Sequence, residues 1–71
     1  MAKNTRIRIY AKRALVYEGT VGQLFTAANS GDVDYEVQVE LDEIDRWAKG
    51  RALSMSIKPY YRITRVAPRR R

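Results

Sequence analysis

Alternation of apolar and polar residues limits the folds open to this chain more than any other feature of its sequence. Residues 5–10 alternate isoleucine with polar residues and tyrosine, a period of two that is typical of a half-buried β-strand. The longest alternating stretch, 33–41, has valine, tyrosine and leucine on one face and acidic residues and glutamine on the other. Residues 53–57 and 60–64 repeat the pattern on either side of Pro59, which marks an edge or a break between two strands. These segments predict an antiparallel sheet with one buried and one solvated face.

A further strand is predicted at 14–18, where Leu15 and Tyr17 repeat the alternation. Residues 11–13 are short enough to join it to the first strand as a hairpin, although they lack an Asn-Gly or Asp-Gly turn signal. The N-terminal part of the chain is therefore predicted to form a two-stranded unit of the sheet.

The period changes in residues 20–28, where apolar side chains recur at the i, i+3, i+4 and i+7 positions of a helix. Thr20 and Gln23 match a capping box, which indicates a helix start. Gly22 weakens such a helix by about 1 kcal/mol relative to alanine. A competing interpretation therefore continues the second strand to Phe25 as a longer hairpin, but the helix fits the spacing better.

A second helix is predicted at 42–49, with Asp42 as its N-terminal cap. Its first turn is acidic, its last turn is basic and Gly50 follows its end, as the helix dipole and the C-terminal geometry prefer. Its buried stripe consists of Ile44, Trp47 and Ala48, with Trp47 assigned to the core rather than to a binding surface.

The sequence therefore predicts an α+β fold: a small single-layer, mainly antiparallel sheet of four to five short strands with one or two short helices on one face. Residues 1–66 are expected to form one domain, followed by a disordered basic tail at 67–71. The predicted core consists of the larger apolar side chains of these elements: Ile7, Ile9, Leu15, Tyr17, Leu24, Phe25, Tyr35, Val37, Val39, Leu41, Ile44, Trp47, Leu53, Met55, Ile57, Tyr61 and Ile63.

Catalytic chemistry has few candidates, because the chain contains neither cysteine nor histidine. The row Asp32, Asp34 and Glu36 has the chemistry of a hard-cation site, but pairing with Arg6 and Arg8 explains the same acids. We therefore expect no enzymatic activity, no metal and no cofactor. No apolar run approaches the ~20 residues of a membrane span, and the N-terminus lacks the apolar segment of a signal peptide, so we expect a cytoplasmic protein without membrane contact.

The net charge of +6 is distributed unevenly along the chain. All eight acidic residues lie in the segment 14–45, which has no lysine or arginine, and the fourteen basic residues flank it. Opposite charges that face each other across a sheet stabilise it by about 0.2–1 kcal/mol per pair, so the simplest interpretation pairs the acidic strand with basic neighbours. An excess of six positive charges then remains for a partner.

Basic and aromatic residues interleave on the solvated face of the predicted sheet. Arginines there can neutralise phosphates while tyrosines stack on unpaired bases, and each stack contributes about 1–3 kcal/mol. The C-terminal arginines offer further phosphate contacts without needing a fold. The first functional hypothesis is a small, mainly non-sequence-specific nucleic-acid-binding protein with these candidate residues: Arg6, Arg8, Tyr10, Lys58, Tyr60, Arg62, Arg65, Arg69, Arg70 and Arg71.

Two other hypotheses remain open. A regulator or inhibitor would dock on a larger host complex through the acidic row Asp34, Glu36 and Glu40 or through the basic flank, and an unpaired acidic row on the surface would favour it. The structural alternative to a binding function is that Arg6 and Arg8 pair with these acids and that the tyrosines merely cover the sheet. A structural protein would instead assemble with its own copies through an uncovered sheet edge, because the edge strands carry few blocking devices.

The predicted strand at 33–41, the helix at 42–49 and a strand ending in Ile-Thr-Arg-Val-Ala-Pro at 63–68 resemble the layout of several small phage-encoded proteins. Those proteins bind and inhibit host machines, and they include RNA polymerase inhibitors and anti-CRISPR proteins. The resemblance covers about half of the chain. It implies a small non-enzymatic protein that docks on a larger, often nucleic-acid-bearing, complex.

Overall fold

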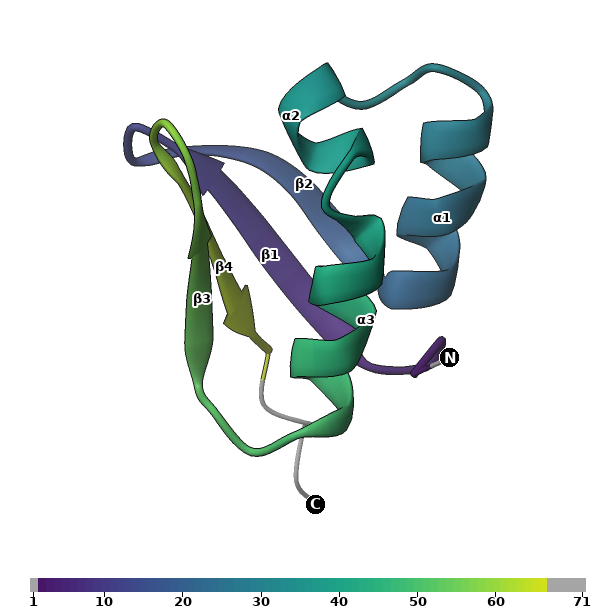
Figure 1. The fold of residues 1–71 in the computed structure, drawn as a ribbon, viewed down its shortest axis with the longest axis vertical. Coiled ribbons are helices and arrows are strands. Elements are labelled where there is room, and N and C mark those ends of the chain that lie inside the picture. Colours follow the sequence, from purple (N-terminus) through teal and green to yellow (C-terminus); the bar gives the residue numbers. More distant parts are fainter. Residues whose placement is uncertain (1, 67–71) are drawn as a thin grey trace.

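The computed structural model describes residues 2–66, and the predicted tail at 67–71 lies outside them. Along the chain, two β-hairpins are separated by three helices (Figure 1). The elements are β1 (Arg6–Ala11), β2 (Ala14–Thr20), α1 (Val21–Asn29), α2 (Tyr35–Gln38), α3 (Leu41–Lys49), β3 (Ser54–Ile57) and β4 (Tyr61–Arg65). The predicted α+β class is confirmed.

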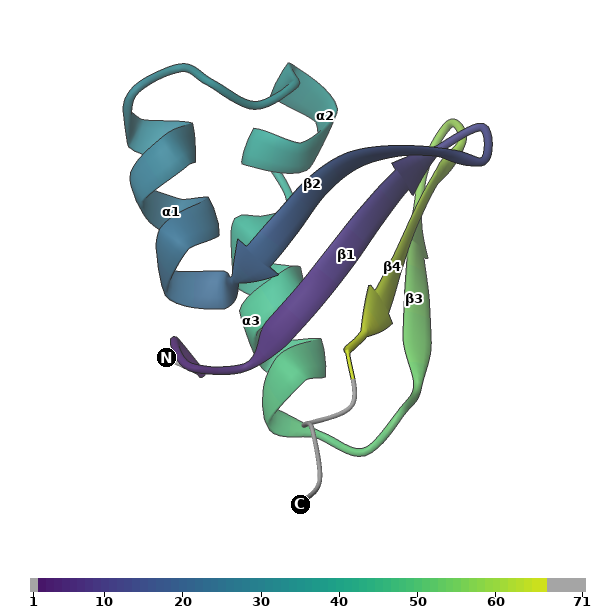
Figure 2. The same ribbon diagram turned by 180° about the vertical axis from the view of Figure 1, so that it is seen from behind.

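The sheet has four strands in the order β2-β1-β4-β3, and every neighbouring pair is antiparallel. Each hairpin supplies one central and one edge strand, because β1 of the first hairpin pairs with β4 of the second. The three helices lie on one face of the sheet, and its other face is turned to solvent (Figures 1 and 2). The one-sided helical layer agrees with the prediction, although it contains one helix more than expected.

The N-terminal hairpin is confirmed, and its turn is made without glycine. Lys12 and Arg13 connect β1 to β2 with positive φ angles of 51° and 77°. Two-residue turns of this kind match the twist of the strands that they join, even when the residues at positive φ carry side chains. The two basic side chains are therefore held at the tip of the hairpin, where both are exposed.

Helix α1 confirms the helical interpretation of residues 20–28. The hydroxyl of Thr20 accepts a hydrogen bond from the Gln23 backbone N–H at 3.1 Å, and the Gln23 side chain accepts one from the Thr20 backbone N–H at 3.0 Å. This reciprocal capping box satisfies two donors that a helix start leaves unpaired. The local signal therefore outweighs the cost of Gly22 within the helix.

The predicted strand at 33–41 is wrong, because these residues form α2 and the start of α3. Alternation at every second position also places Val33, Val37 and Leu41 four residues apart, which is the spacing of one side of a helix. Val37 is buried, and Val33 and Leu41 are partly buried against the same core. The helical arrangement covers the apolar face of the sheet, which a fifth strand in the same layer would leave exposed.

Because residues 33–41 contain helices instead of a strand, three further predictions also fail. Tyr35 and Val39 lie on the outer side of α2, with 73% and 56% of their surface exposed, rather than in the core. Helix α3 begins at Leu41 with Glu40 as its N-cap, so the predicted cap at Asp42 is also wrong. The strand-helix-strand layout behind the resemblance to phage-encoded inhibitors is absent, because its first element is helical.

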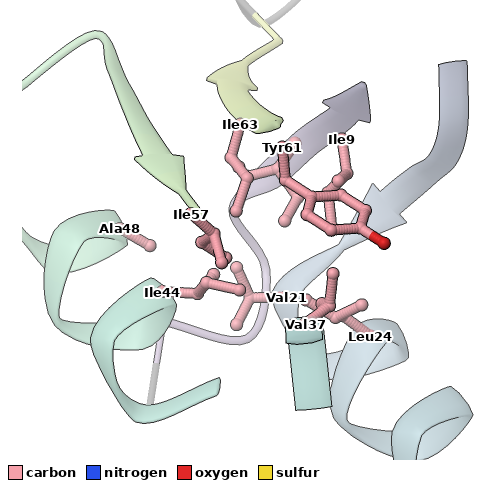
Figure 3. Packing of buried hydrophobic residues seen from close by; sticks show 10 residues of the cluster. Ile9, Val21, Leu24, Val37, Ile44, Ala48, Ile57, Tyr61 and Ile63 are labelled. Atoms are coloured by element: carbon pink, nitrogen blue, oxygen red, sulfur yellow. The ribbon is translucent and has the colours of Figure 1, made fainter. Parts of the chain in front are cut away.

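The core lies between the sheet and the helices (Figure 3). Eight of the predicted core residues are buried there: Ile7, Ile9, Leu24, Val37, Ile44, Ile57, Tyr61 and Ile63. Five more are partly buried against them: Tyr17, Phe25, Leu41, Trp47 and Met55. The prediction is wrong for Leu15 and Leu53, which are 50% and 80% exposed. A bulge in β2 moves Leu15 to the solvent side, where it lies opposite Tyr10.

Candidate nucleic-acid interface

The uncovered face of the sheet gathers three of the four arginines that were predicted as contacts on β1 and β4. Arg6, Arg8 and Tyr10 alternate with the two buried isoleucines of β1, so their side chains project from the face opposite the core. Arg62 is the register partner of Tyr10 on the adjacent strand, and Arg8 faces Thr64. The fold therefore brings three arginines from the two central strands to one face. Figure 2 shows β1 and β4 from this uncovered side.

The charge of this face is almost entirely positive. Glu18 is the only acidic residue in the four strands, and its carboxylate lies 3.1 Å from Nε of Arg8. Both side chains are substantially exposed, so this ion pair contributes little stability. Within residues 2–66, Arg6 and Arg62 form no ion pair. The expected pairing of Arg6 and Arg8 with the acidic row does not occur, because that row lies in the helical layer.

The turn of the second hairpin carries two further residues that were predicted to contact nucleic acid. Lys58 and Tyr60 lie in the exposed turn between β3 and β4. The Lys12 ammonium lies 4.9 Å from the centre of the Tyr60 ring. The centres of the Tyr60 and Tyr61 rings are also 4.9 Å apart. A base that stacks on Tyr60 therefore competes with Lys12 for the ring face that the ammonium covers. Tyr60 is therefore a weaker candidate for base stacking than the alternation pattern suggested.

Arg65 differs from the other candidate arginines, because its guanidinium group points to the end of α3. It donates hydrogen bonds to the backbone carbonyls of Ala48, Trp47, Gly50 and Ala52 at 2.8–3.1 Å. Its guanidinium carbon also lies 4.7 Å from the centre of the Trp47 ring. The carbonyls of Trp47, Ala48 and Gly50 lie at the C-terminal end of α3, where helix carbonyls run out of intrahelical donors, and that of Ala52 lies in the loop that follows. Arg65 is thus committed to the fold, and Arg69, Arg70 and Arg71 lie outside the described residues.

The acidic residues proposed for protein binding lie on the helical side. Asp34 accepts a hydrogen bond of 2.5 Å from the hydroxyl of Tyr61, and so connects the start of α2 to β4. Glu36 and Glu40 form no ion pair with any other residue of the described part of the chain. The sequence could not reveal the contact between Asp34 and Tyr61, since it joins residues 27 positions apart.

The contact with Asp34 makes the stability of the fold sensitive to alkaline pH. The hydrogen bond to the Asp34 carboxylate, together with burial, raises the pKa of Tyr61 well above its ordinary value. The protonated phenol is the favoured form in the folded state, so its contribution is fully present below about pH 10 and is lost as the pH rises further. We expect the free energy of unfolding to fall more steeply above pH 10 in the parent protein than in a Tyr61→Phe variant, measured by urea denaturation. Tyr35→Phe, at an exposed position, should retain the parent slope, and an unchanged slope in Tyr61→Phe would contradict the coupling.

A depression of about 760 Å³ lies at one end of the uncovered face. Arg6 and Arg62 line it together with the hydroxyl residues Ser54 and Thr64 and the exposed Leu53. Ser54 and Thr64 are register partners on β3 and β4, so the pairing of these strands shapes the depression. The alternation of residues 53–57 predicted Leu53 in the core, whereas it is exposed at the rim of this depression, and Thr64 was predicted only as part of the polar face.

Other site chemistry is limited in the described part of the chain. Residues 2–66 contain no cluster of three or more acidic, histidine or cysteine side chains that could hold a metal ion. No helix within this range is long and apolar enough to cross a membrane.

Comparison with known proteins finds no matching family model and no significantly similar curated protein or solved structure. The functional argument therefore depends on the chain's own residues.

Proposed function

We propose that this protein is a non-enzymatic nucleic-acid-binding protein that contacts the phosphate backbone through the uncovered face of its sheet. The observation that carries the proposal is the separation of charge between the two layers. Three arginines and one acid lie on the outer face of the sheet, while seven acids lie between residues 32 and 45 in the helical segment. A face with this charge attracts a polyanion, and the acidic layer disfavours binding of a polyanion from the other side.

The contacts on this face favour binding without strong sequence preference. Arginine guanidinium groups match phosphate geometry, and phosphate contacts carry no base information. Tyr10 is half-buried and Tyr60 is in contact with Lys12, so base stacking is a smaller contribution than charge. Lys58 and the two basic residues of the first turn extend the positive surface to the hairpin ends.

The proposal is tested by fluorescence anisotropy of labelled single-stranded and duplex oligonucleotides at about 50 and 200 mM salt. Micromolar binding with a steep salt dependence is expected. In Arg6→Ala/Arg62→Ala, the affinity at the lower salt should fall at least about tenfold, and the slope of log affinity against log salt should decrease by about 0.7–0.9 per arginine removed. Tyr60→Ala removes an aromatic ring but no charge, so it should lower the affinity less than the double arginine variant does.

Two controls locate the site. Arg46→Ala removes the same single charge as Arg62→Ala, but on the helical side, where Arg46 pairs with Glu43. It should leave binding nearly unchanged. A chain that ends at Ala67 removes the terminal arginines and should retain most of the binding. Absence of binding at the lower salt, or an equal loss in Arg46→Ala and Arg62→Ala, would contradict the proposal.

A further inference from the structure

Helix α2 exposes two large apolar side chains that the fold does not use. Tyr35 begins α2 and Val39, four residues later, is its C-cap, and 73% and 56% of their surfaces are exposed. Val37, between them, points into the core and is 2% exposed. In a chain with a small core, leaving two such side chains in water is unfavourable unless a partner covers them.

Acidic side chains flank this apolar pair. Glu36 and Glu40 line a groove of about 320 Å³ with Tyr35 and Val39, where α2 approaches Ile57 of β3. Lys58 is the one cation lining the groove, and it forms no ion pair with another residue of 2–66. We call Tyr35, Glu36, Val39 and Glu40 the α2 patch. Its partner should offer an apolar recess with positive charge at the rim.

The uncovered face of the same chain offers such a recess. The depression of about 760 Å³ has Arg6 and Arg62 in its lining, and neither arginine forms an ion pair within the described residues. Leu53 contributes apolar surface there and is 80% exposed. Charge and polarity of this depression are thus complementary to those of the α2 patch.

We propose that the protein self-associates, with the α2 patch of one copy docked in the depression on the uncovered face of a second copy. Tyr35 enters beside Leu53, while Glu36 and Glu40 approach Arg6 and Arg62. An aromatic side chain in such a recess buries about 150–250 Å² and is a frequent centre of interface energy. The charged rim sets the orientation and makes the association sensitive to salt.

The position of the two surfaces determines the kind of assembly. Helix α2 lies in the layer that covers one face of the sheet (Figures 1 and 2). The depression is lined by residues of the uncovered face, Arg6, Ser54, Arg62 and Thr64 among them. Two copies therefore meet through different surfaces, so one copy keeps a free depression and the other keeps a free α2 patch. Such a head-to-tail contact produces open chains of increasing length instead of a closed dimer. It also uses Arg6 and Arg62, so bound nucleic acid and a second copy compete for the same arginines.

Two variants, each blocked on one surface, test the proposal by sedimentation equilibrium at low salt. The first, Tyr35→Ala/Glu36→Gln, alters the α2 patch, and the second, Arg6→Gln/Arg62→Gln, alters the depression. The parent protein should show an average mass that rises with concentration beyond two chains and falls to one chain in about 0.5 M salt. Each variant alone should remain a monomer, and an equimolar mixture should form a 1:1 heterodimer through the one intact pair of surfaces.

Controls distinguish this interface from general charge effects. Asp42→Asn and Arg46→Gln remove exposed charges of α3 outside both surfaces and should associate like the parent protein. All substituted residues are exposed, so the fold should be retained, and circular dichroism of every variant checks this. A parent protein that is monomeric at all concentrations would overturn the proposal. So would a mixture of the two variants that stays monomeric, because a head-to-tail contact requires the heterodimer.

Discussion

Replacement of Ile63 by alanine is expected to lower the free energy of unfolding by about 3–4 kcal/mol, the usual cost of truncating a buried isoleucine when the cavity cannot collapse. Ile63 is fully buried in central strand β4, where its register partners are Ile9 on one side and Met55 on the other. A 71-residue domain has a total stability of only about 4–10 kcal/mol, so this loss is about a third or more of the total.

Urea denaturation followed by far-ultraviolet circular dichroism measures this loss. Leu53→Ala is the matched control, because it removes a leucine of similar size that is 80% exposed. Its free energy of unfolding should change by less than about 0.5 kcal/mol. If the two variants lose similar stability, the assignment of Ile63 to the core and of Leu53 to the surface is contradicted.

Replacement of Arg65 by alanine is expected to lower the free energy of unfolding by about 2–4 kcal/mol, since a typical hydrogen bond contributes about 0.5–1.5 kcal/mol and its guanidinium group makes four. The hydrogen bonds that the variant loses connect the end of α3 to β4. The positive charge also complements the negative end of the helix dipole. Packing of the guanidinium group over the Trp47 ring adds to the effect.

Two controls separate the hydrogen bonds from the charge of Arg65. Arg65→Lys keeps the charge but loses the planar fork, so it should retain only a minor part of the stability. Arg62→Ala, three residues away on the same strand but exposed, should change the free energy of unfolding by less than about 0.5 kcal/mol. An Arg65→Ala variant that keeps its stability but loses oligonucleotide binding would show that Arg65 belongs to the binding surface after all.

Both arginines lie on β4, and nothing in the sequence distinguishes their roles. Arg62 alternates with buried neighbours and was correctly predicted on the solvated face. Arg65 was predicted to contact phosphate because it lies near the arginine-rich end of the chain. Its actual partners are carbonyls 13–18 positions earlier, which only the packing of α3 beside β4 brings within reach.

The segment 33–41 shows why the helical layer was harder to predict than the sheet. A strict period of two is compatible with a strand, but every second member of such a series is also four residues apart and can share one side of a helix. Whether such a segment forms a strand or a helix depends on which apolar surface of the rest of the fold it has to bury. Here β1, β4 and β3 present isoleucines on one face, and α2 and α3 bury it with Val37 and Ile44.

The sequence by itself determined the elements whose signals are local. The first hairpin follows from short alternating segments, the two strands of the second from alternation on both sides of Pro59, and α1 from the capping box formed by Thr20 and Gln23. Composition and spacing within about ten residues suffice for these, because each is stabilised mainly by neighbours in the chain. The separation of acidic and basic segments was also visible in the sequence.

The tertiary structure alone decided which of these charges meet. Pairing of β1 with β4 brings Arg6, Arg8 and Arg62 to one face, although more than fifty residues separate the first and the last. Folding of 33–41 as helices places the acids on the opposite layer, unpaired with those arginines. The physical reason is that charges on solvated surfaces contribute little to the choice of fold, whereas burial of the apolar side chains determines it. The charged faces of this protein are therefore a consequence of how its core packs.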